Sequence, residues 1–329
     1  MATIKDVAKR AGVSVGSVSN FINNIEVKEK TRIAIEKAIE ELNYEPNMYA
    51  RGFKKNKTNT VALIIPSVWH PFFGEMTYNV EKSLRKYDMK MILCNTEDDY
   101  EVELNYIAMA KQNKVDGIIA MTYSDIDKYI SANLPIISID RYFSEDITYV
   151  TSDNFKGGRI AAEELVKAGC KNLAFIGSGS LIDNATRKRR KGFESYCEEN
   201  NITYEICDNL DGNKDFNCAL DDFININFKE KKKVDGIFTI TDDHAIDVIN
   251  RLKAINISVP NDVKIIGYDG RRTSRDDVIK ISTIKQQVEL IAKAAVEALI
   301  ELIDKKERKK EKRKEILIPV KFIKGYTTK

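Results

Sequence analysis

The chain lacks every segment that would place it in or across a membrane. Its 329 residues contain no apolar run near the ~18 residues that a membrane span needs. The amino terminus shows no secretory pattern, because Lys5, Asp6 and Lys9 interrupt any apolar stretch. Cysteines number only five, and none forms a C-x-x-C pair. Cys94 and Cys170 each border an apolar segment, so we expect buried free thiols and a protein of the reducing cytoplasm.

The chain also has few of the residues and motifs that enzymes use. It contains two histidines, His70 and His244, too few for a histidine-rich metal cluster. The phosphate-binding patterns G-x-x-x-x-G-K-[ST] and G-x-G-x-x-G are missing. We therefore expect no metal, no cofactor and no catalysis. Paired carboxylates in a cleft leave a glycoside-processing enzyme as an alternative.

The excess of positive over negative charge is confined to the amino-terminal part of the chain. Residues 1–60 hold 11 Lys and Arg against 7 Asp and Glu, a net of +4, whereas the whole chain carries +3. The remaining residues are therefore close to neutral. An excess of positive charge on one small module suits contact with phosphates, although many helical domains are mildly basic.

The first fifty residues have the spacing of a helix-turn-helix. Thr3 can cap a first helix that runs to about Ala11, with Asp6 at the capping-box position. Gly12 permits a turn, and Ser14 can cap a second helix over Val15–Ile22. Two short helices joined in this way fit the DNA major groove. The sequence therefore predicts an α-helical DNA-binding head.

A third helix and a linker follow. The apolar spacing predicts a helix over about Lys28–Leu42, and Pro46 ends that pattern. Asn47 can cap a short fourth helix from Met48 to about Phe53, after which residues 54–60 form a polar linker.

From Val61 onward, short apolar runs alternate with amphipathic helices. The helical stretches include Glu75–Tyr87, Val102–Gln112, Lys156–Ala168, Arg187–Asn200 and Asp243–Ile255. The apolar runs, which we predict to be buried strands, are Val61–Ile65, Met91–Cys94, Gly117–Met121, Ile136–Ile139, Leu173–Ile176, Gly236–Ile240 and Val263–Gly267. This alternation is typical of parallel sheets covered on both faces. The strands are too many for one sheet, so we expect an α/β body of two doubly wound lobes with a ligand cleft at the carboxyl ends of their strands.

Several motifs occur in a specific order along the whole chain. The head reads TIKDVAKRAGVSVGSVSNFIN and then KTRIAIEKAIEELNYEPN. The body reads HPFF at 70–73, VDGII at 115–119, SDNFKGGRIAAEEL at 152–165, TDDHAIDV at 241–248 and VPNDVKIIGYDG at 259–270. In this order and spacing the chain resembles the lactose/purine repressor family of bacterial transcription regulators.

The resemblance implies a domain organisation with a periplasmic-binding-protein-like body. It gives a DNA-binding domain at 1–46, a hinge helix and linker at 47–60, and an effector-binding and dimerisation domain at 61–329. Within the body, the N-lobe would comprise about 61–157 plus 287–317. The C-lobe would comprise about 158–286 plus 318–329.

The resemblance also implies which head residues contact DNA. Base edges would face Val15, Gly16 and Asn20, with Ser17 close by, and Asn20 suits adenine. A contact of Asn20 with phosphate or water alone stays open. The other implied contacts are Lys5, Ser14, Asn23, Thr31, Tyr44, Asn47 and Arg51, together with Phe53, which stands where relatives place a minor-groove leucine wedge. Packing of Phe53 against the body is the alternative. Because Gly52 lowers helix propensity by ~1 kcal/mol, we expect the hinge to fold only on DNA.

Most of the candidate effector residues follow predicted strands, whereas Arg189 lies in a predicted helix and Gln286 at the crossover between the lobes. Trp69, His70, Phe72 and Phe73 offer aromatic faces for stacking, although at least one of the two phenylalanines is better explained as core. The polar candidates are Asp140, Arg141, Arg189, Thr241, Asp242, Asp269 and Gln286, of which Arg189 and Thr241 fall on ligand-contacting positions of the family. Carboxylates and a guanidinium suit sugar hydroxyls, while a purine ligand remains an alternative. Helix capping or bracing of the lobes is the structural alternative for Asp153, Asn154 and Asp242.

These expectations combine into one functional hypothesis. A homodimer would bind a pseudo-palindromic operator of double-stranded DNA and repress a carbohydrate-utilisation operon. A small molecule between the lobes would control operator affinity, in a direction that the sequence leaves open. A solute-binding protein shares the body fold, but it needs a secretion signal and no DNA head. Two departures from the family pattern are Asp247 in place of a glycine and Gln287 in place of a proline.

Overall fold

The computed structural model describes most of the chain. The described residues are 2–23, 25–45, 57–122, 134–142, 147–178, 186–208, 215–230, 234–272, 274, 276–305 and 314–329. They form two compact units, Met1–Thr58 and Asn59–Lys329. The predicted fourth helix over 48–53 lies outside the described residues.

The head contains the three predicted helices, α1 (Ile4–Ala11), α2 (Val15–Ile22) and α3 (Glu29–Glu41). The capping box at Thr3 is confirmed, since its hydroxyl accepts from the Asp6 N–H and the Asp6 carboxylate accepts from the Thr3 N–H. Gly12 ends α1 with a φ of 66°, a left-handed conformation that glycine adopts without strain. A small core then forms between the helices from Val7, Ala8, Val18, Ile35 and Ala38.

The first lobe of the body is built on a six-stranded sheet in the order β11-β5-β4-β3-β1-β2, with every pair parallel. Its strands are β1 (Thr60–Ile65), β2 (Lys90–Asn95), β3 (Gly117–Ala120), β4 (Ile136–Ile139), β5 (Tyr149–Ser152) and β11 (Glu315–Ile318). Helices α5 (Pro71–Arg85) and α11 (Val288–Asp304) share one hydrophobic cluster with the sheet, and α6 (Tyr100–Gln112) belongs to a second cluster. Burial on both faces explains why the central strands are almost continuously apolar.

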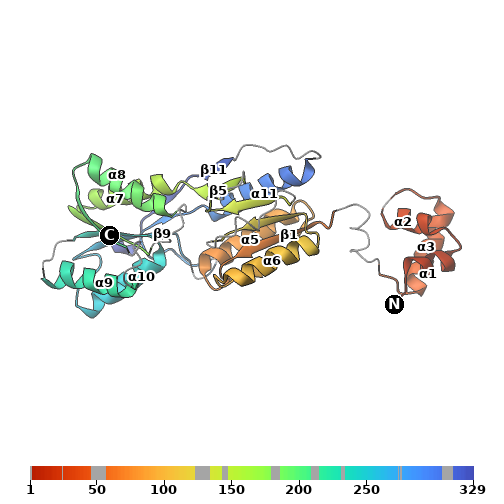
Figure 1. Ribbon diagram of the computed structural model, residues 1–329, viewed down its shortest axis with the longest axis horizontal. Coiled ribbons are helices and arrows are strands. Elements are labelled where there is room, and N and C mark those ends of the chain that lie inside the picture. Colours follow the sequence, from red (N-terminus) through yellow and green to blue (C-terminus); the bar gives the residue numbers. More distant parts are fainter. Residues whose placement is uncertain are drawn as a thin grey trace. The chain divides into compact units, whose positions relative to one another are not determined.

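The second lobe repeats this arrangement with the order β12-β10-β9-β8-β6-β7, in which only the β10–β12 pair is antiparallel. Its strands are β6 (Asn172–Ile176), β7 (Thr203–Cys207), β8 (Gly236–Thr239), β9 (Lys264–Asp269), β10 (Thr283–Lys285) and β12 (Lys321–Ile323). As Figure 1 shows, α7 (Asn154–Lys167) and α8 (Arg187–Glu199) lie together, while α9 (Phe216–Ile224) and α10 (Asp242–Ala254) lie together elsewhere on the lobe. A π-helical turn, Asn225–Glu230, continues α9, and a short 3-10 turn, Tyr326–Thr328, ends the chain.

Three segments of chain cross between the lobes, and hydrogen bonds tie them together. The first leads from β5 to α7, the second from β10 to α11, and the third from β11 to β12. The Ser152 hydroxyl donates to Gln286 Oε1 at 2.6 Å, and Gln287 Nε2 donates to the Pro319 carbonyl at 2.7 Å. The two glutamines therefore link the second crossing to the other two.

Two glycines let α7 and α8 approach closely, which places α8 against the polar residues between the lobes. A Cβ atom on Gly158 would lie 1.9 Å from the Arg189 carbonyl oxygen, and one on Gly192 would lie 1.9 Å from the Phe155 carbonyl oxygen. Larger residues would therefore push the helices apart and displace Arg189.

Four of the five cysteines are buried and unpaired, as expected for Cys94 and Cys170, and Cys218 is exposed. Within the part of the chain that the structure describes, no helix has the length and apolar character needed to cross a membrane.

Candidate functional site

The second head helix presents an exposed face made of the residues that the sequence assigned to base contacts. Val15, Gly16 and Asn20 are exposed and Ser17 is partly buried, whereas Val18 is fully buried against the head core. Ser14 caps this helix, since its hydroxyl accepts from the Ser17 N–H at 3.1 Å. The arrangement leaves the first turn and one face of α2 accessible to a groove.

The head residues that were predicted to contact the DNA backbone differ in how exposed they are. Lys5 is exposed, with its side chain on α1. Asn23, Thr31 and Tyr44 are partly buried, and Tyr44 packs against the head core. The remaining candidates, Asn47, Arg51 and Phe53, lie outside the described residues.

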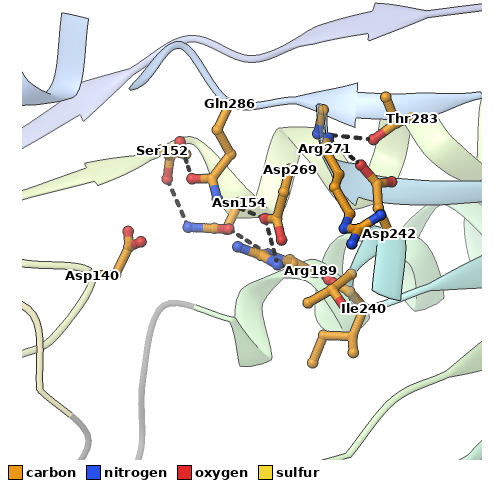
Figure 2. A network of polar contacts seen from close by, with 12 residues as sticks. Asp140, Ser152, Asn154, Arg189, Ile240, Asp242, Asp269, Arg271, Thr283 and Gln286 are labelled. Carbon is orange, nitrogen blue, oxygen red and sulfur yellow. Dashed lines mark hydrogen bonds and ion pairs between the residues drawn. The ribbon is translucent and has the colours of Figure 1, made fainter. Parts of the chain in front are cut away.

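In the body, the buried side chain of Arg189 lies at the centre of a polar network between the lobes (Figure 2). Its Nε donates to Asn154 Oδ1 and its Nη1 donates to the Ile240 carbonyl, each at 2.7 Å. Nη1 also lies 3.5 Å from Asp269 Oδ1, and the guanidinium carbon lies 3.7 Å from the centre of the Tyr268 ring. Within the described chain these contacts use Nε and Nη1 and leave Nη2 for another acceptor.

Asp269 joins Arg189 to the crossing segments. It ends β9 with a φ of 107°, and its Oδ1 accepts from Gln286 Nε2 at 2.8 Å. Through Gln286 the network reaches Ser152 at the end of β5. Burial raises the pKa of Asp269 to about 6, while the Arg189 charge and the Gln286 hydrogen bond oppose that rise. Arg189 therefore helps to keep this carboxyl ionised near neutral pH.

Two further buried carboxyls lie near the network. Asp242 is the first residue of α10, and its Oδ2 accepts from the Arg271 N–H at 2.6 Å. Burial, together with the charge of Asp269, raises the pKa of Asp242 to about 8. Asp140 follows β4 with a φ of 60°, and its Oδ1 accepts from the Thr151 hydroxyl at 2.6 Å. Burial raises the pKa of Asp140 as well.

The aromatic candidates differ in exposure. Trp69 is 88% exposed, whereas Phe72 and Phe73 are partly buried against the core of the first lobe. This packing supports the interpretation of the phenylalanines as core residues. Neighbouring His70 instead reaches the second lobe, since its Nε2 lies 2.6 Å from Asp243 Oδ2 in α10.

Comparisons with known proteins match both units of the chain. Residues 3–47 match the family described as bacterial regulatory proteins, lacI family, and residues 162–328 match the periplasmic binding protein-like domain. A sucrose operon repressor of Pediococcus pentosaceus is 35% identical over 326 residues, which cover 98% of both chains. A ribose operon repressor of Halalkalibacterium halodurans is 32% identical and covers 93% of this chain and 92% of its own.

The chain belongs to the lacI family of bacterial regulatory proteins. Its fold also agrees with a lac repressor dimer bound to operator and an anti-inducer, at a TM-score of 0.81, 22% identity and 99% coverage of each chain. The predicted fold class, a helical head with an α/β body of two parallel-sheet lobes, is thereby confirmed. The family consists of regulators, and the named relatives above are repressors rather than enzymes.

The structure brings together only some of the effector residues predicted for this lacI-family chain. Arg189, Asp269 and Gln286 share one network, with Asp140 and Asp242 nearby (Figure 2). Arg141 is buried, and Thr241 caps α10, where its hydroxyl lies 2.7 Å from His244 Nδ1. Trp69 is largely exposed to solvent. The ligand contacts of all these residues stay predictions.

Other members of the network were missed or assigned a structural role. Asp153 caps α7, which confirms the structural alternative for that residue. Asn154 holds the Arg189 guanidinium, and Ser152 and Thr151 bind Gln286 and Asp140. No apolar run marked Ser152, because Tyr149–Ser152 mixes polar and apolar residues. The Ile240 contact uses a backbone carbonyl, which no side-chain pattern reveals.

Across the described ranges, no group of three or more His, Cys, Asp or Glu side chains is placed to hold a metal ion.

Proposed function

We propose that this lacI-family protein is a homodimeric repressor of a carbohydrate-utilisation operon, and that a sugar bound between its lobes controls operator affinity. The observation that carries the sugar assignment is the buried arrangement of Arg189 beside Asp269. A hydroxyl both donates and accepts hydrogen bonds, so vicinal hydroxyls can accept from a guanidinium and donate to a carboxylate. The carboxyls of Asp140 and Asp242 are buried and the Asp269 side chain is only 9% exposed, a set of acidic groups that favours a neutral, hydroxyl-rich ligand over an anionic one.

In this proposal the head reads DNA through α2. Asn20 would hold adenine through two hydrogen bonds and Val15 would pack against a thymine methyl group, while Lys5 contacts phosphate. Two heads related by a two-fold axis require a pseudo-palindromic operator. The protein would act in the cytoplasm, where that DNA is, and without catalysis or a cofactor.

The DNA half of the proposal is tested by selecting duplexes from a random pool with the full-length protein. We expect enrichment of a pseudo-palindrome whose affinity falls steeply with salt, because phosphate contacts release counterions. Equal affinity for the enriched duplex and for random duplex would contradict the proposal.

The ligand half is tested by adding a panel of neutral sugars, sugar phosphates and nucleobases to the protein–duplex complex. We expect one neutral sugar to change the affinity for the enriched duplex. A response to a nucleobase alone would instead support the purine alternative, and a response to sugar phosphates alone would contradict the charge argument.

A further inference from the structure

Among the described residues of the body, three ion-pair bridges connect the two lobes outside the crossing segments and the Arg189 network. The first lies between α5 of the first lobe and α10 of the second lobe. His70 Nε2 lies 2.6 Å from Asp243 Oδ2, and the other oxygen of Asp243 lies 2.8 Å from Arg271 Nε. All three side chains are about one-third exposed, so solvent reaches the bridge.

The second bridge joins the same helix of the first lobe to the segment after β9. Arg272 Nη2 donates to Glu75 Oε1 at 2.7 Å, across 197 residues of sequence. The two side chains are 25% and 29% exposed, which makes this the most enclosed of the three bridges. Glu75 lies on α5, five residues beyond the N-cap residue His70, so both bridges attach to the start of one helix.

The third bridge joins α8 to β11. Lys188 Nζ donates to Glu315 Oε1 at 3.3 Å and lies 4.7 Å from the centre of the Tyr142 ring. Lys188 directly precedes Arg189, the central residue of the network between the lobes. In the same way, Asp243 follows Asp242, and Arg272 follows Arg271.

We propose that these three bridges form an ionic latch that holds the two lobes together, with Glu75 and Arg272 as positioning residues for the interlobe site. The latch goes beyond the proposed function, because it concerns the closing of the body alone and needs neither operator nor effector. The second-lobe residue of each bridge, Asp243, Arg272 or Lys188, is adjacent in sequence to a residue of the polar network or of its immediate surroundings. Separating the bridges is therefore expected to disturb the network as well.

The latch predicts that ionic strength and proton concentration set how closed the body is. Partly exposed ion pairs are weak and screened by salt, so each bridge is expected to change the closed-to-open ratio by about two- to five-fold. Salt is therefore expected to open the lobes even where every residue of the latch is intact.

The first bridge adds a proton dependence, because it contains a histidine. The hydrogen bond to Asp243 raises the pKa of His70 above 6.5, against desolvation, and the Asp243 and Asp269 charges add to the rise while Arg271 opposes it. The bridge is therefore fully formed below pH 6.5 and is lost as the pH rises through the raised pKa. Burial also raises the pKa of Asp269 and of Asp242, so closing favours proton uptake there too, and a His70 variant is needed to separate the contributions.

The chain carries a natural pair of positions for measuring closure. Trp69 is its single tryptophan and adjoins His70. Cys218 is its single exposed cysteine and lies on α9, where the nearby Phe216 ring contacts His244 of α10. An acceptor dye on Cys218 therefore reports the distance from the first-lobe side of the latch to the second-lobe side through energy transfer from Trp69.

The experiment uses the full-length protein labelled at Cys218 and mixed with excess unlabelled Trp69→Phe chain, so that transfer arises within one chain. We expect transfer to fall with added KCl and to be lower in Glu75→Gln and in Arg272→Gln. The charge swap, Glu75→Arg with Arg272→Glu, is expected to restore it, which a merely structural role of either residue would not do. Circular dichroism establishes that each variant is folded.

Equal transfer in the wild type and both single variants would overturn the latch, as would a charge swap that fails to restore transfer. Transfer that does not respond to KCl would overturn it without any substitution. The proton dependence is measured by the same energy transfer. In the wild type, transfer should fall as the pH rises above 6.5, and His70→Gln should reduce that fall. An identical pH profile in the variant would show that His70 is not part of the latch. A result that contradicts the latch does not contradict the proposed operator binding or ligand response, which are measured separately.

Discussion

Replacing Arg189 with methionine is expected to destabilise the body in a way that depends on pH. Methionine retains much of the side-chain volume but leaves the Asn154 Oδ1 and Ile240 carbonyl acceptors without a donor. Losing these two charge-assisted bonds costs about 2–4 kcal/mol, even where Asp269 is protonated. This is the expected loss of unfolding free energy at pH 5.

At higher pH the same variant also leaves a buried carboxylate without its cation. The pKa of Asp269 is raised to about 6 in the folded wild type, against the usual 3.8. Protonation of Asp269 therefore stabilises the folded state fully below pH 3.8, and this stabilisation is lost as the pH rises through 6. Without Arg189 the pKa rises further, so the loss continues above pH 6. Each further unit adds about 1.4 kcal/mol. The difference between variant and wild type should therefore widen from pH 5 to pH 8.

Urea denaturation followed by circular dichroism at the two pH values measures this difference. The control is Arg190→Met, since Arg190 is adjacent but partly exposed and pairs with Glu194 and Asp208. The control should cost below about 1 kcal/mol, with no widening. An Arg189→Met loss that is the same at pH 5 and pH 8, or that Arg190→Met equals, would refute the assigned role of the buried pair.

Two other substitutions test the head and the packing of the body. Asn20→Ala should weaken binding to the selected operator by about 1–3 kcal/mol, measured by fluorescence anisotropy, and leave binding to random duplex unchanged. Lys5→Ala should weaken binding to both duplexes. Equal losses on both duplexes for Asn20→Ala would instead assign Asn20 to a phosphate contact. Gly158→Ala should lower the free energy of unfolding by about 3 kcal/mol in urea denaturation, because its Cβ would meet the Arg189 carbonyl. In Gly16→Ala the nearest neighbour of the new Cβ is 3.6 Å away, so this variant should stabilise the head by up to ~1 kcal/mol. Losses of similar size in the two glycine variants would contradict the packing argument.

Much of the fold could be predicted because local chemistry and tertiary structure agree. The capping box at Thr3 and the cap at Ser14 marked the starts of two helices, and both caps are present. The strand at Ile136–Ile139 has the predicted bounds, because a short buried strand in a parallel sheet is apolar throughout. The strands Tyr149–Ser152 and Thr203–Cys207 were missed, since their mixed polar and apolar residues carry no such signal.

The site was predicted less completely, because its geometry depends on contacts between distant segments. Asp269 and Arg189 could be chosen from their places after a strand and within a family motif. The bonds of Gln287 to Pro319 and of Arg272 to Glu75 join residues 32 and 197 positions apart, which no local pattern connects. Gln287, a departure from the family pattern, thereby acquires a specific role in tying two crossings together.

The central claim is that DNA binding by the head and ligand binding between the lobes are coupled. Once the sugar panel has identified an effector, calorimetry can measure its affinity for the free dimer and for the operator-bound dimer. Reciprocal coupling of ~1–3 kcal/mol predicts affinities that differ by about 5- to 150-fold. Identical affinities in the two titrations would contradict the account.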